Sequence, residues 1–160
     1  MSGLHGQYFT PSFSGFDPSN TGTFGGRPDR IADGNLPTGE RSIGRWFDSK
    51  AFKIPGCPDA NPACTNPANV GRFGNSGLNI LEGPGIANLD FSLSKYFNLR
   101  ENMRLQFRLN MVNALNHPNF AIPRSNIRNQ GTSRTINSMA RVLNGLPATR
   151  EIDLRLRLEF

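Results

Sequence analysis

The sequence has little of what marks a helical membrane protein, a metalloprotein or an enzyme. No stretch approaches the roughly 20 continuous apolar residues that a transmembrane helix needs, and the opening MSGLHGQYFTPSFSG lacks the basic and apolar regions of a signal peptide. The two histidines, His5 and His117, lie far in sequence from the cysteines, so no metal-ligand cluster is expected. Nucleophile and phosphate-binding motifs are missing too, and we expect no catalytic, cofactor or metal site and no enzyme.

What the chain does have is glycine, proline and phenylalanine. Its 160 residues include 17 glycines, 12 prolines and 12 phenylalanines, against one tryptophan and two tyrosines. Such a composition indicates turns and strands rather than helices. The formal net charge is +6, from 18 basic and 12 acidic residues. Because the arginines are scattered and form no basic run, we expect no nucleic-acid partner.

The two cysteines, Cys57 and Cys64, lie within PGCPDANPACTNP. A disulfide that closed this short loop would restrain the unfolded chain by about 2.5 kcal/mol. The other interpretation is two free thiols in a cytosolic loop. We favour the disulfide, which implies an oxidising compartment.

The pattern of the chain changes near residue 85. Residues 1–85 repeat turn signals such as FDPSNTGTFGGRPDR and ADGNLPTGER, and no piece alternates over a full strand. We expect a long extracellular-loop-like region, either ordered or disordered. Its aromatic residues favour packing; they include Phe24, Trp46, Phe47, Phe52 and Phe73.

Within residues 86–160, three segments alternate apolar and polar side chains, which is typical of strands. Over 103–116 a helix would be apolar on two opposite sides with arginine between them, whereas a strand fits with few exceptions. The polar segment 98–102 would be the turn of a β-hairpin. The expected barrel strands are 89–97, 103–116 and 151–160, with a long loop at 117–150.

The sequence therefore predicts an all-β fold of antiparallel strands, and the strand lengths favour a membrane. A tilted strand crosses a bilayer in about 9–11 residues, whereas soluble strands usually have about 5–6. A short turn followed by a long loop is typical of outer-membrane barrels. The alternatives are a soluble β-rich interaction or adhesion domain and an oligomeric pore. In a partial transmembrane barrel the polar residues expected to face the lumen are Asp90, Arg104, Arg108, Asp153 and Arg155.

Aromatic residues near the predicted strand ends suggest a girdle at the lipid headgroups. Tyr96 and Phe97 end one predicted strand and Phe160 ends another, and antiparallel order brings them to the same rim. Lys95 is the single charge on the predicted apolar face, near that rim. Its long stem can carry the ammonium to the headgroups.

Most of residues 8–160 resemble a known family. The motifs RPDR…DGNLP, RWFD…AF, NILEGPG…DFSLSKYF and NALNHPNF occur in this order. Together they resemble the C-terminal end of the TonB-dependent receptor-like outer-membrane barrels of the Oar type. The resemblance implies the outer membrane of a Gram-negative-type cell. It also implies a recognition signal for the barrel-assembly machinery, formed by Ile152, Leu154, Leu156, Leu158 and Phe160.

The same resemblance implies a role in energy-coupled substrate uptake, without catalysis. The chain would supply final barrel strands and extracellular loops. Since the smallest closed barrels need about eight strands, we expect a fragment of a larger receptor. The expected partners are outer-membrane lipid, the barrel-assembly machinery and the TonB system, the last through N-terminal parts absent from the sequence. Ligand contact is expected in the long loops, near Trp46, Cys57 and Cys64.

Overall fold

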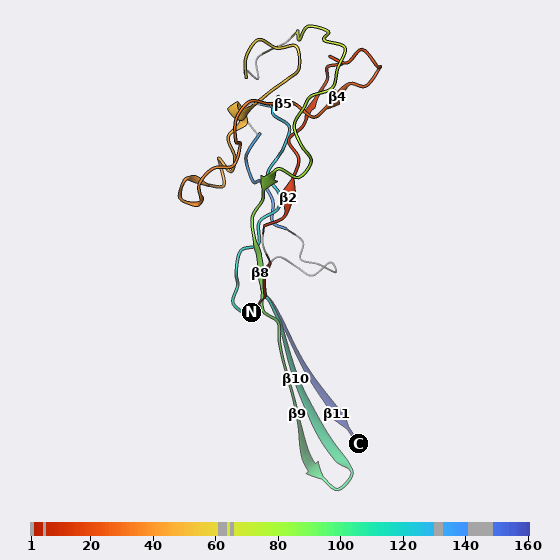
Figure 1. Ribbon diagram of the computed structural model, residues 1–160. Coiled ribbons are helices and arrows are strands. Elements are labelled where there is room, and N and C mark those ends of the chain that lie inside the picture. The colour runs from red at the N-terminus through yellow and green to blue at the C-terminus, as the bar shows by residue number, and fades with distance from the viewer. Residues whose placement is uncertain (1, 5, 61–63, 65, 130–132, 141–148) are drawn as a thin grey trace. The chain divides into compact units, whose positions relative to one another are not determined.

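The fold is all-β, with short and long antiparallel strands and two 3-10 turns (Figure 1). A computed structural model describes residues 2–4, 6–60, 64, 66–129, 133–140 and 149–160. The chain forms two compact units. The strand unit consists of Met1–His5, Gly85–Phe120 and Met139–Phe160, and the loop unit consists of Gly6–Pro84 and Ala121–Ser138.

The main element of the strand unit is a three-stranded antiparallel sheet with the order β11-β10-β9. Its strands are β9 (Phe91–Arg100), β10 (Met103–Val112) and β11 (Glu151–Glu159). The C-terminus lies at the same end of this sheet as the β9–β10 turn (Figure 1). Their lengths of ten, ten and nine residues are those of bilayer-crossing strands.

The ends of these strands differ from the sequence prediction. β9 begins at Phe91 instead of 89 and continues past Phe97, because Asn98 still pairs with Arg104. The turn is therefore the pair Glu101 and Asn102, not five residues. β10 ends at Val112 instead of 116, since the next residue, an asparagine, has a positive φ that stops an extended strand.

A second pairing in the strand unit was not predicted. β1 (Ser2–Leu4) pairs antiparallel with β8 (Ile86–Asn88). Three residues are too few to give a readable alternation, so the sequence pattern could not reveal this pair.

The loop unit is built on three two-stranded antiparallel ladders, each only two residues long. It also contains two 3-10 turns, η1 (Thr38–Glu40) and η2 (Ser49–Ala51). The ladders are β2 (Tyr8–Phe9) with β7 (Leu81–Glu82), β3 (Phe13–Ser14) with β4 (Gly25–Gly26), and β5 (Asp29–Arg30) with β6 (Phe52–Lys53).

A phenylalanine core holds the loop unit together. Phe47 and Phe52 are each 1% exposed, and Phe47 meets Phe9 and Phe52 edge to face at centroid distances of 5.6 and 6.4 Å. The backbone of Gly34 lies so close to the Phe52 ring that any side chain there would overlap it. Packing of Phe47 and Phe52 agrees with the sequence prediction, whereas Phe24 and Phe73 are exposed.

Part of the expected long loop at 117–150 packs with the first half of the chain. Its portion Ala121–Ser138 belongs to the loop unit. Backbone bonds join Ile127 N–H to Ser12 O at 2.9 Å and Trp46 N–H to Arg134 O at 2.9 Å. Ile127 is buried in the core as a result.

Candidate functional site

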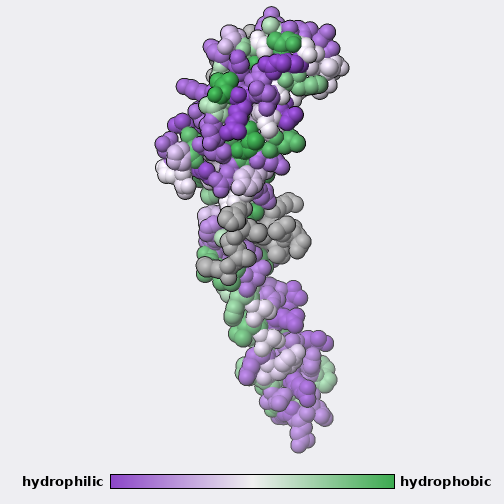
Figure 2. All heavy atoms as spheres, viewed as in Figure 1, coloured by the Kyte–Doolittle hydropathy of each residue, from purple (hydrophilic) through white to green (hydrophobic). Residues whose placement is uncertain are grey.

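The three-stranded sheet has two chemically different faces. One face carries every second side chain of β9, β10 and β11, and with one exception these are apolar. Those on β9 and β11 are exposed, Leu156 by 66%, whereas those on the central strand β10 are half-buried. Figure 2 shows hydrophobic and hydrophilic residues side by side over this sheet. The apolar rows across the sheet are Phe91–Met111–Ile152, Leu93–Leu109–Leu154 and Phe97–Leu105–Leu158.

Lys95 is the exception on the apolar face. It lies directly opposite Phe107, which in turn pairs with Leu156. Because β9 continues to Arg100, Lys95 is in the middle of its strand. The predicted position of Lys95 near the rim is therefore wrong.

The predicted aromatic girdle also needs correction. Tyr96 lies on the polar face, where its hydroxyl accepts a hydrogen bond from Gln106 Nε2 at 2.8 Å. Phe97 lies on the apolar face but three residues before the end of β9. Phe160, 94% exposed, remains at the end of the sheet, beside the turn residues in a shallow hollow.

The polar face is rich in arginine. On β11, Arg155 pairs with Asp153 at 2.7 Å and Arg157 pairs with Glu159 at 3.4 Å. Arg108 of β10 lies directly opposite Arg155 and next to Ser94 of β9. Arg104 lies opposite Glu159 and Asn98. Four of the five residues predicted to face the lumen, namely Arg104, Arg108, Asp153 and Arg155, are thus on one face.

Asp90, the fifth, has a different place. It precedes β9, and its carboxylate accepts hydrogen bonds from Asn113 N–H at 3.0 Å and from Asn88 Nδ2 at 2.9 Å. It therefore ties the start of β9 to the end of β10. Asp90 thus stabilises the strand ends and does not lie along the polar face.

An asparagine cluster that sequence reasoning missed completes this end of the sheet. Asn113 is fully buried; its Nδ2 donates to His117 O at 2.9 Å and its Oδ1 accepts from His117 N–H at 3.0 Å. Asn119, also fully buried, accepts from Ala87 N–H at 2.9 Å. The side-chain amide of Asn113 replaces a strand partner for the turning backbone. The repeated asparagines of NALNHPNF were the available signal.

Asp29 is a buried carboxylate of the loop unit. It accepts two hydrogen bonds from the Arg72 guanidinium, at 2.7 and 2.8 Å, and one from Asn75 N–H at 3.1 Å. The bonds from Arg72 hold the pKa of Asp29 below its usual value, although burial opposes this. The same pair raises the pKa of Arg72. The ion pair fixes the segment after Arg72 against β5.

Trp46 packs the loops together. Its indole Nε1–H donates to Glu82 O at 2.8 Å, and the Arg41 guanidinium lies 5.9 Å from its ring centroid. Arg41 also forms an ion pair with the Glu82 carboxylate at 2.9 Å. The polar edge of Trp46 is therefore satisfied within the loop unit.

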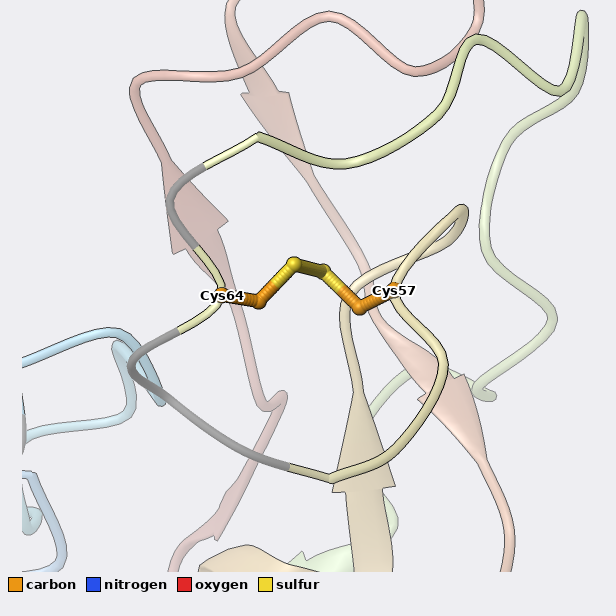
Figure 3. The surroundings of a disulfide bond; sticks show 2 residues. All are labelled: Cys57 and Cys64. Carbon is orange, nitrogen blue, oxygen red and sulfur yellow. A yellow bond between two sulfur atoms is a disulfide. The ribbon is translucent and has the colours of Figure 1, made fainter.

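Cys57 and Cys64 form a disulfide that closes a small loop after β6 (Figure 3). Cys57 is buried at the edge of the phenylalanine core, and Cys64 packs against that core. The bond therefore attaches the loop to the core and does not lie free at the surface.

The described residues contain no cluster of three or more metal-ligating side chains. They also contain no helix long and apolar enough to cross a membrane.

A comparison with known protein families finds a match for this chain. The family described as "Outer membrane beta barrel domain" matches residues 2–152, which include parts of both units. No curated protein and no solved structure matches the chain. Outer-membrane barrels have strands with one apolar and one polar face, which is the arrangement of β9, β10 and β11. The chain belongs to this outer-membrane β-barrel domain family, and its location is the outer membrane.

Proposed function

We propose that the chain supplies adjacent wall strands and outer loops to a TonB-dependent receptor of the Oar type, which takes up a substrate at the expense of cellular energy. The observation that carries this proposal is the combination of a two-faced sheet with a large, separately packed loop unit. Ordered outer loops suit capture of a solute, and a two-faced sheet suits a wall between lipid and a wet interior.

The strand order supports the proposed role as part of a larger wall. In the described residues β9 and β11 are the edges of the sheet. Unpaired backbone N–H and C=O groups are costly in lipid, so both edges need neighbouring strands. Those neighbours, outer-membrane lipid, the barrel-assembly machinery and the TonB system are the proposed partners.

The soluble adhesion alternative fits less well. A soluble sheet buries its apolar face against another layer, whereas Leu154 and Leu156 stay 59% and 66% exposed. A purified chain in plain buffer is expected to aggregate through this face.

Uptake by cells that carry or lack the gene tests the transport role. We expect one or more solutes to leave the medium only when the gene, TonB and the proton gradient are all present. The intact protein in liposomes should not cause swelling in sugar solutions, because a receptor is closed at rest. Swelling without TonB would identify an open pore and contradict the proposal.

The proposed assembly signal has its own test. Removing Phe160 from the intact protein is expected to prevent outer-membrane assembly, whereas Glu159→Gln, a neighbouring change on the polar face, should be tolerated. Normal assembly without Phe160 would contradict this part of the proposal.

A further inference from the structure

A charged side chain in the middle of the apolar face is the least explained feature of the sheet. Two apolar side chains of β9, Phe91 and Leu93, precede Lys95 on this face, and two more, Phe97 and Leu99, follow it. Its neighbour across the sheet is Phe107. None of these can neutralise an ammonium group, and none of the ion pairs among the described residues includes Lys95.

The distance to the headgroups decides what Lys95 can reach. Successive residues on one face of a strand are about 6.6 Å apart along the strand, or about 5 Å along the membrane normal at the usual tilt. Either rim is two such steps away, hence about 10 Å. A lysine stem extends about 6 Å, so the ammonium cannot reach a flat headgroup layer. Water and headgroups must therefore move inward to the ammonium, which local thinning of the bilayer permits.

We propose that Lys95 is a lipid-binding site, at which the ammonium holds the phosphate of a lipid headgroup and draws the bilayer inward along β9. Charge complementarity favours a phosphate, and the continuous apolar surroundings favour lipid. A carboxylate on the strand that pairs with β9 in the complete wall is the competing partner, and it would make the effect of Lys95→Leu independent of vesicle thickness and headgroup. A second copy of this sheet is excluded as the partner, because its apolar face offers no carboxylate. The inference rests on the outer-membrane location and not on the transport role.

Reversible unfolding of the intact protein in phospholipid vesicles tests the site. In thick phosphatidylcholine vesicles, Lys95→Leu should raise the folding equilibrium constant about 30-fold or more, since a lysine at the bilayer centre is costly. In thin, short-chain vesicles containing phosphatidylglycerol the gain should fall below about threefold, because the wild-type lysine finds its phosphate there. Lys95→Arg should behave as the wild type.

Arg108→Leu is the matched control. It also removes one positive charge near the middle of the sheet, but from the polar face. Its effect should be the same in thick and thin vesicles. If Lys95→Leu likewise showed no dependence on thickness or headgroup, the proposal would be overturned.

Native mass spectrometry of the protein extracted in mild detergent gives a second readout. Wild type and Lys95→Arg should retain a phospholipid that Lys95→Leu loses. Retention by all three variants, or by none, would contradict the proposal. Loss of a bound protein from Lys95→Leu would contradict it too, because the occupant would then be a protein carboxylate.

Discussion

The strand unit and the loop unit use the same kind of side chain in opposite ways. Phe47 and Phe52 of the loop unit are each 1% exposed and meet other rings, whereas Phe91 and Phe97 of the sheet are each 48% exposed. The loop unit has an interior of its own, which water favours. The sheet has none, and its apolar face is stable only against hydrocarbon. The two units therefore differ in what surrounds their phenylalanine side chains, and not in the type of residue.

The largest effect is expected from Phe47→Ala. This change leaves a cavity between Phe9 and Phe52 and should destabilise the loop unit by about 3–5 kcal/mol. Limited proteolysis of the intact protein in outer membranes should show faster cleavage within Gly6–Pro84 but unchanged protection of the strands. Phe24→Ala, at an exposed site, is the control and should change stability by less than about 0.5 kcal/mol. Equal effects of the two changes would mean that the core is not what stabilises the loops.

Leu156→Arg tests whether the apolar face of the sheet contacts hydrocarbon. An arginine in the middle of the lipid-facing side should lower the free energy of unfolding in vesicles by about 2–4 kcal/mol. Gln106→Arg adds the same charge on the polar face and should cost little. If both substitutions were equally tolerated, the apolar face would not contact hydrocarbon.

Phe47→Ala and Leu156→Arg both test features that could be predicted from the sequence. Ten-residue alternation in the segment around Arg104 and Leu109 was sufficient to assign the strands and their two faces, because period two has few competitors over that length. Strand ends were harder: Leu89 and Asp90 continue the pattern, yet Asp90 is used to hold Asn113. The pairing of Asp29 with Arg72 spans 43 residues of irregular loop, and no local pattern reports such a contact.

Removing the disulfide should have a smaller effect on the loop unit. Replacing Cys57 and Cys64 together by serine releases a short loop and should cost about 2.5 kcal/mol. Thermal unfolding followed by near-ultraviolet signals of Trp46 would measure it. Reduction of the wild type should reproduce the double substitution, whereas an unchanged unfolding temperature would show that the loop adds nothing to the core.

Asp29→Asn is expected to have the smallest effect, about 2 kcal/mol at neutral pH, because Arg72 is half exposed. The folded state lowers the pKa of Asp29. Its contribution is therefore complete above the unfolded value of about 3.9 and is lost as the pH falls through the lower folded value. Unfolding of the loop unit between neutral and acidic pH should show this loss in the wild type and less of it in Asp29→Asn. Parallel pH profiles would contradict the role of the ion pair.

The placement of Ala121–Ser138 within the loop unit has a consequence for the order of biogenesis. Ser12 and Ile43 bond to backbone groups of Ile127 and Ile136, more than ninety positions later in the chain. During synthesis the ribosome must therefore pass both hairpin strands before the first half can complete its fold. Such distant closures are slow, so the loop unit completes its fold only after both strands of the hairpin have been synthesised.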